Sequence, residues 1–154
     1  MSSPTETLRV TRVIPAKKER VFRAWTNPDE VRRWWTIGEG WKAEFVEMDV
    51  RVGGKLRLGN RPRGGDLVLV TGEFLEVRPP DRLVYSWRFL PAAPEVNTIT
   101  VDFREMGEKT EVTITHANSS REMAAGARDG WAYALSSLST FLGVTGPPFG
   151  RKSK

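Results

Sequence analysis

Apolar and polar residues alternate with a period of two along seven stretches of this 154-residue chain, which is the pattern of half-buried β-strands. Glycine, proline, asparagine and aspartate fill most of the short segments between these stretches and suit tight connections. Consecutive strands with short connections form an antiparallel meander. Both alternate sets of residues in the second stretch contain apolar side chains, so the sequence leaves its inward face open. The predicted strands span residues 8–14, 41–50, 54–58, 67–77, 82–90, 96–105 and 109–117.

Two short segments between the first and second strands have helical spacing instead. Residues 16–26 place Val21, Phe22 and Trp25 on one side of a helix. Asn27-Pro28 then predicts the start of a second short helix, because asparagine caps a helix N-terminus and proline suits the first turn.

The longest predicted helix follows the last strand. Ser119 and Glu122 match the S-x-x-E capping box, and apolar residues then recur at steps of three and four up to Leu142. Gly143 and Gly146 can end this helix. Because the apolar face of a sheet must be covered by another layer, we predict an α+β fold in which a seven-stranded curved antiparallel sheet surrounds the long C-terminal helix. A gap between these two layers can become a ligand cavity.

Composition narrows the class of protein. The length fits a single domain, and 39% hydrophobic and 28% charged residues are typical of a globular protein. We expect this domain to span residues 7–143, with flexible ends at 1–6 and 144–154. The absence of cysteine excludes disulfides and thiolate chemistry, and a single histidine excludes histidine-rich metal sites. No apolar run is long enough to span a membrane and no signal peptide is recognisable, so we expect a cytoplasmic protein without membrane contact.

The charge pattern adds little to this picture. The formal net charge is +5, but the basic residues are scattered and not gathered in one run or on one helix face, so we expect no nucleic-acid partner. The sequence contains neither a metal-ligand cluster nor the G-x-S-x-G or H-E-x-x-H motif. We therefore predict no metal, no cofactor and no catalytic residue.

A series of short motifs in a fixed order carries a family resemblance. The motifs are Ile14-Pro15-Ala16, Val21-Phe22-Arg23-Ala24-Trp25, Asn27-Pro28, Trp34-Trp35, Asp49-Val50-Arg51-Val52-Gly53-Gly54, Gly72-Glu73-Phe74-Leu75-Glu76-Val77, Pro79-Pro80-Asp81-Arg82-Leu83-Val84, Thr110-Glu111-Val112-Thr113-Ile114-Thr115-His116 and Gly130-Trp131. With them the chain resembles, over about residues 8–142, the helix-grip superfamily of START and birch-pollen-allergen-like domains (SRPBCC). Within that superfamily it is most similar to the branch named for the activator of heat-shock protein 90 ATPase.

This resemblance implies a helix-grip fold with an internal cavity, but it does not imply one function. The superfamily includes lipid carriers, hormone receptors, polyketide cyclases and co-chaperone domains. We expect non-enzymatic binding of a small hydrophobic or amphipathic ligand, with a stress-related role as one setting. One alternative is a polyketide cyclase-like or hydrolase-like enzyme that uses an acid–base residue of the cavity. The other is a chaperone-linked interaction module, in which an exposed apolar patch mediates homodimerisation or binds a chaperone or other protein partner.

The single histidine and two adjacent tryptophans are the most informative site candidates. His116 shares the apolar side of its strand with Val112 and Ile114, which points it toward the core or the cavity. It is either a polar anchor for a ligand or a histidine whose ring bonds a backbone carbonyl. Trp34 and Trp35 cannot share one helix face, so one should turn inward and the other toward the cavity mouth or solvent.

Two charged positions have competing interpretations. Arg57 is the candidate partner for a ligand carboxylate if its side chain turns into the cavity, and otherwise its stem covers an apolar edge. Asp49 and Arg51 are better explained as a brace beside a glycine turn than as an acid–base site. From strand parity and the resemblance together, we predict as ligand-binding residues Trp34, Trp35, Met48, Arg57, Phe74, Trp87, Phe89, Phe103, Ile114, His116, Trp131 and Leu135.

Overall fold

The computed structural model describes the backbone of residues 5–90 and 93–144, and the side chains of residues 7–90, 95–117 and 126–143. Residues 1–4 and 145–154, which form most of the two ends predicted to be flexible, lie outside the described residues, as does Gly146. The side chains of Ser119 and Glu122, the predicted capping box, also lie outside them.

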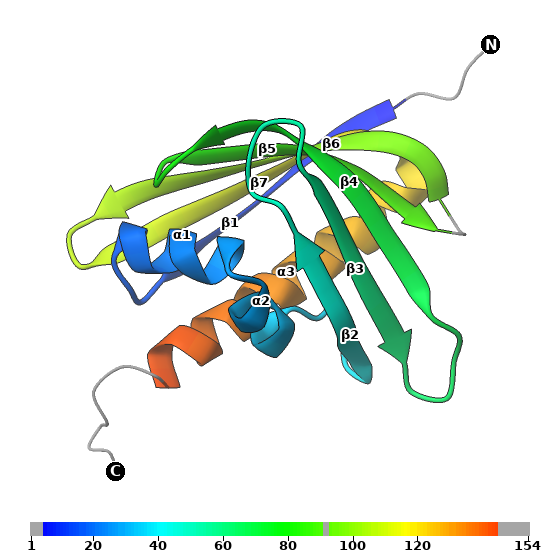
Figure 1. Ribbon diagram of the computed structural model, residues 1–154, viewed down its shortest axis with the longest axis horizontal. Coiled ribbons are helices and arrows are strands. Elements are labelled where there is room, and N and C mark those ends of the chain that lie inside the picture. The colour runs from blue at the N-terminus through cyan, green and yellow to red at the C-terminus, as the bar shows by residue number, and fades with distance from the viewer. Residues whose placement is uncertain (1–4, 91–92, 145–154) are drawn as a thin grey trace.

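The predicted seven-stranded antiparallel sheet is confirmed (Figure 1). Its strands are β1 (Thr5–Ile14), β2 (Trp41–Met48), β3 (Lys55–Pro62), β4 (Val68–Arg78), β5 (Arg82–Leu90), β6 (Ala93–Met106) and β7 (Lys109–Ser120). They pair in the order β1-β7-β6-β5-β4-β3-β2, so β1 and β2 form the two edges. β3 and β6 are longer than predicted. β3 continues through the polar segment to Pro62, and β6 already begins at Ala93.

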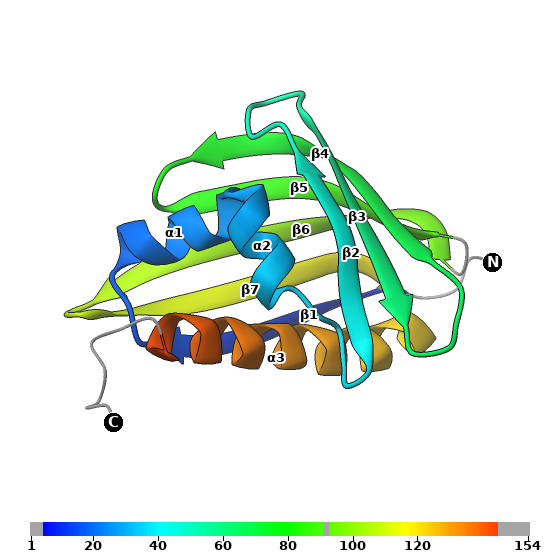
Figure 2. The same ribbon diagram turned by 60° about the horizontal axis from the view of Figure 1, so that its bottom comes forward.

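Three helices cover the concave side of this sheet. They are α1 (Lys18–Thr26), α2 (Pro28–Trp34) and the long α3 (Arg121–Val144). Figure 2 shows α3 running beside β1 beneath the curled sheet, with α1 and α2 lying over the open side. This is the predicted α+β arrangement of a curved sheet around a C-terminal helix.

Local chemistry explains where α2 begins. The Asn27 side chain accepts hydrogen bonds from the backbone N–H groups of Asp29 and Glu30, at 2.9 and 3.2 Å. Pro28 occupies the first turn, where its missing N–H has no intrahelical partner to lose. The cap therefore fixes the direction of α2, which sets the positions of Trp34 and Trp35 that follow.

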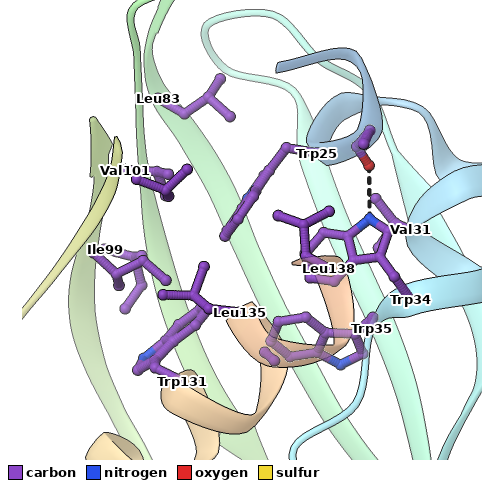
Figure 3. Packing of buried hydrophobic residues seen from close by; sticks show 14 of the residues in the cluster. Trp25, Val31, Trp34, Trp35, Leu83, Ile99, Val101, Trp131, Leu135 and Leu138 are labelled. Atoms are coloured by element: carbon purple, nitrogen blue, oxygen red, sulfur yellow. Dashed lines mark hydrogen bonds between the residues drawn. The ribbon is translucent and has the colours of Figure 1, made fainter. Parts of the chain in front are cut away.

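The core is an aromatic cluster between α1, α2, α3 and the sheet (Figure 3). Trp25 and Trp34 pack with ring centroids 5.0 Å apart, and Trp34 donates its indole N–H to the Ala24 carbonyl at 2.9 Å. From α3, Leu135 and Leu138 are completely buried against this cluster. A buried leucine side chain contributes about 1.5–3 kcal/mol through removal of its surface from water, so this half of α3 holds the helix on the sheet.

A β-bulge settles the inward face of β2, which the sequence left open. The pairing of β2 with β3 shifts register between Ala43 and Phe45. Ala43 is buried before the bulge, whereas Val46 and Met48 pack against the core after it. Because the extra residue reverses the alternation, both sets of β2 residues contribute to the interior, and neither parity alone describes the strand.

The inward orientation considered for Arg57 is wrong. Arg57 lies on the outer face of β3, half exposed, with Nη1 2.8 Å from Glu47 Oε1 on β2. Its guanidinium carbon also lies 5.5 Å from the centre of the Phe45 ring. The alternation of β3 explains this orientation, because Leu56 and Leu58 on either side occupy the buried face.

Candidate functional site

A pocket of about 260 Å³ opens between the first half of α3, strands β5 to β7 and the segment that follows α2. β5 supplies two aromatic residues, β6 two polar residues, β7 the histidine, and α3 small residues and one tryptophan. Its lining is Trp35, Ile37, Trp87, Phe89, Glu95, Asn97, His116, Gly126, Ala127, Gly130 and Trp131.

Three tryptophans form one wall of this pocket. The ring centroids of Trp87 and Trp131 are 5.2 Å apart, those of Trp35 and Trp131 5.5 Å, and those of Trp35 and Trp87 5.8 Å. Figure 3 shows Trp35 and Trp131 on the side of the core where α3 faces the segment after α2. Rings at these separations support each other in edge-to-face and tilted contacts, so the wall is rigid before any ligand enters.

Two of these indoles have their N–H groups occupied by protein acceptors. Trp35 donates to Asn60 Oδ1 at 2.7 Å, and Trp131 donates to His116 Nδ1 at 3.0 Å. Asn60 is itself 1% exposed, which makes it a dedicated partner within the core. Trp35 and Trp131 therefore present mainly carbon and π surface to the pocket.

His116 lies at the inner end of the pocket, 3% exposed, and it bonds side chains, not the backbone carbonyl that the sequence interpretation considered. Because an indole N–H can only donate, Nδ1 of His116 is the acceptor of the bond from Trp131. The proton is then on Nε2, which donates to Asn97 Oδ1 at 2.6 Å. The network thus selects one tautomer of the imidazole and fixes its orientation.

The environment keeps His116 neutral. Burial lowers the pKa of its imidazole from 6.5 to about 4. The Trp131 N–H acts in the same direction, because a proton on Nδ1 would face another donor. Such a group is a weak base at neutral pH, and both ring nitrogens already have partners, so its geometry suits a fixed polar element of the pocket.

The open volume comes from the sequence of α3. Gly126 and Gly130 are four residues apart, on one side of the helix, with Ala127 beside them. A Cβ atom at Gly126 would meet no atom within 4 Å, and one at Gly130 would lie 3.8 Å from Ile37. The first half of α3 therefore leaves space above the sheet that the leucines of the second half fill.

The predicted binding residues divide into four groups in the structure. Five line the pocket: Trp35, Trp87, Phe89, His116 and Trp131. Trp34 and Met48 border an inner gap of only about 20 Å³. Phe74, Phe103, Ile114 and Leu135 are buried in the core away from the pocket, and Arg57 lies on the outer face of the sheet.

Glu95 and Asn97 line the pocket but were not predicted as binding residues from the sequence. Asn97 shares the parity of the buried Ile99, so it stands on the concave side of β6, whereas Glu95 lies where the pairing with β5 is irregular. Strand alternation indicated the inward position of Asn97, because Asn97 lies within the predicted strand. Glu95 was placed in the connecting segment of residues 91–95, just before the strand predicted over residues 96–105. The small residues of α3 and Ile37 were missed as well.

A larger hollow lies elsewhere, between α2, β2 and the turn after β3. It holds about 1160 Å³ and is an open groove with polar walls, whose charged residues include Arg32, Arg33, Lys42 and Arg63. These basic side chains are exposed and match the solvated surface that the scattered charge predicted. Its lining is as polar as it is apolar, whereas the lining of the smaller pocket is mainly apolar, so the smaller pocket is the better candidate for a small-molecule site.

No cluster of three or more histidine, cysteine, aspartate or glutamate side chains suited to a metal ion occurs among the described residues. Within the same residues, none of the helices has the length and apolarity needed to cross a membrane.

Comparison with known proteins gives a family and a fold. The family model described as Activator of Hsp90 ATPase homolog 1-like protein matches residues 15–143. No curated protein matches the chain. Among solved structures, the chain is similar to protein CV1439 from Chromobacterium violaceum, with 27% identity and a TM-score of 0.80 over 87% of this chain and 94% of that one.

Two further structures share the fold at lower identity. CalU16 from Micromonospora echinospora is 24% identical, with a TM-score of 0.69 over 91% of this chain and 78% of that one. DynU16, described as a protein in the dynemicin biosynthetic locus, is also 24% identical, with a TM-score of 0.74 over 92% of this chain and 48% of that one.

Proposed function

The chain belongs to the family of Activator of Hsp90 ATPase homolog 1-like proteins, and from the geometry of its pocket we propose that it binds a small, mainly apolar molecule between the sheet and α3. The observation that carries this proposal is the pocket of about 260 Å³ with a tryptophan wall on one side and only glycine and alanine at the facing turn of α3. Aromatic walls with a few placed polar groups are typical of small-molecule sites.

The pocket gives such a molecule both affinity and orientation. Removing about 200 Å² of ligand surface from water contributes about 5 kcal/mol before the cost of association is subtracted. The preorganised contacts among Trp35, Trp87 and Trp131 mean that little side-chain ordering accompanies binding. The Asn97–His116–Trp131 network holds the inner end of the pocket in one arrangement.

The alternatives have weaker support. A catalytic role needs an acid–base group poised near neutral pH, whereas His116 has a pKa of about 4 and partners on both nitrogens. An interaction module needs a contiguous apolar patch. The exposed large apolar residues among those described, Val13, Val52, Leu67, Leu75, Val96, Met106 and Tyr133, are spread over many segments of the chain.

A thermal-shift panel tests the proposal directly. The panel contains fused-ring aromatics, flavonoids, sterols and fatty alcohols and acids, with quenching of tryptophan fluorescence as an independent readout. A ligand at one hundred times its dissociation constant adds about 2.7 kcal/mol, which raises the melting temperature by about 5–10 °C for a domain of this size. The absence of any shift or quenching across the panel would refute the proposal.

Position 126 offers a matched pair of variants for the hits. Gly126→Leu extends a side chain into the pocket without a clash at Cβ, whereas Gly126→Ala adds only one methyl group. Both replace a helical glycine, so neither should reduce stability. We expect Gly126→Leu to weaken binding at least tenfold and Gly126→Ala to change it little. Equal binding by both variants would show that the ligand binds elsewhere.

A further inference from the structure

The pocket contains one charged side chain, and its sign points to the chemical class of the ligand. Glu95 is the single lining residue among those described that is charged at neutral pH, because burial keeps the His116 imidazole neutral. The basic residues nearest in sequence do not change this balance. Arg88 has the opposite parity to Trp87 and is exposed, so it belongs to the outer face of β5.

Glu95 reaches the pocket where the pairing of β5 with β6 is irregular. Asn97 pairs with Trp87 across the β5–β6 ladder, and Ile99 is completely buried on the concave side. Glu95 and Val96 fall between the pairs Trp87–Asn97 and Phe89–Ala93, where the register shifts, and both are exposed. Because Glu95 lines the pocket and is also exposed, it lies at the mouth, where the pocket meets solvent.

Four other polar atoms of the lining already have protein partners. The N–H groups of Trp35 and Trp131 and both nitrogens of His116 have protein partners. Among the described residues, no group forms an ion pair or hydrogen bond with the Glu95 carboxylate. A donor group on a ligand can therefore bind the Glu95 carboxylate without displacing a protein partner.

Resting on the proposed function, we infer that the ligand is an apolar molecule with a protonated amine at one end, and that the pocket discriminates against carboxylates. The ammonium pairs with Glu95 at the mouth, where charge-assisted hydrogen bonds are stronger than neutral ones. The adjoining indole rings attract the same cation through their π faces. A carboxylate in this position would lose hydration and face a like charge, with no cation in the described lining to compensate.

Three probes with one ring system test this inference. They are 2-naphthylmethylamine, 2-naphthalenemethanol and 2-naphthoic acid, which differ only in the polar group and are fully charged or neutral at pH 7.5. Dissociation constants are measured by titration calorimetry and tryptophan fluorescence at low salt. We expect the amine to bind at least tenfold more tightly than the alcohol, and the acid to bind most weakly.

Two glutamate variants identify the group responsible. Glu95→Gln should reduce the affinity for the amine to that for the alcohol and leave the affinity for the alcohol unchanged. Glu105→Gln is the matched control, because it removes the same charge from an exposed position at the other end of β6 and should change neither. Added salt should reduce the preference of the wild type for the amine, because the carboxylate lies at the exposed mouth.

The outcomes separate this inference from the proposed function. Equal affinities of the amine and the alcohol, a preference for the acid, or an unchanged preference in Glu95→Gln would overturn the inference, while binding of the alcohol in the pocket would leave the proposed function standing. Failure of all three probes to bind at millimolar concentration would count against both. Binding of the alcohol that Gly126→Leu weakens confirms that the probes occupy this pocket.

Discussion

The buried histidine predicts a specific loss of stability in mild acid. The pKa of His116 is about 4 in the folded protein and about 6.5 in the unfolded chain, so between these values the unfolded state binds more protons. The free energy of unfolding therefore rises with pH through this window and falls on acidification. From these two pKa values, lowering the pH from 7 to 5 should reduce the free energy of unfolding by about 2 kcal/mol.

The composition of the chain makes this measurement clean. His116 is the only histidine, so no other side chain with an unperturbed pKa between 5 and 7 contributes. Urea unfolding at pH 5, 6 and 7 gives the slope, and a melting curve should shift by about 4–8 °C over the same range. In His116→Gln the slope above pH 5 should nearly vanish, because glutamine does not titrate. Each protein is compared with its own value at pH 7, so the intrinsic effect of the substitution cancels.

Two results would refute this reasoning. A wild-type stability that does not change between pH 7 and pH 5 would mean that the folded pKa is not lowered. An equal slope in the wild type and in His116→Gln would assign the effect to carboxylates. The C2 proton of the single imidazole gives a direct check by NMR, since its chemical shift should stay at the neutral value down to about pH 5.

Three substitutions outside the pocket test the packing and the surface. Gly54→Ala would place a Cβ atom 1.9 Å from the Asp49 carbonyl oxygen, so it should lower the free energy of unfolding in urea by about 2–3 kcal/mol. Gly126→Ala should cause no such loss, because a Cβ atom there meets no other atom within 4 Å. Asn27→Ala removes both capping hydrogen bonds of α2 and should lower the free energy of unfolding by about 1 kcal/mol, whereas Asn27→Ser should retain most of it. Arg57→Gln breaks a half-exposed ion pair with Glu47, so it should change the free energy of unfolding by less than about 0.5 kcal/mol. It should also leave ligand affinity unchanged, and a large loss of affinity would contradict the position of Arg57 on the outer face of the sheet.

Local periodicity predicted the architecture because each signal depends on neighbours in the sequence. The Asn27-Pro28 cap, the alternation of β5 and the spacing of Leu135 and Leu138 on α3 all refer to one face of one element. The concave position of His116 followed from the same parity argument, and its 3% exposure confirms it. Such patterns predict which face a residue occupies but give no information on what lies opposite.

The sequence therefore could not predict which inward-facing residues belong to the packed core and which line the open pocket. Phe103 and Trp87 both face inward, yet Phe103 meets the rings of Phe22 and Trp25, whereas Trp87 faces the glycine-rich turn of α3. The difference depends on where α3 crosses the sheet, which is a tertiary property. The bulge in β2 escaped detection for a related reason, since a register shift concerns two strands at once.

The two halves of α3 explain how one helix can hold the fold together and still leave room for a ligand. In its second half, Ala134, Leu135 and Leu138 are completely buried and fill the space above the sheet. In the first half, Gly126 and Gly130 offer no side chain, and each glycine in a helix interior lowers helix stability by about 1 kcal/mol relative to alanine. Trp131 stands between the halves, packed on Trp35 and Trp87 and bonded to His116, so the pocket wall is also the end of the core. Because the wall belongs to the core, the shape of the pocket is fixed by the same packing that stabilises the domain, and the glycines decide only how much of that space stays open.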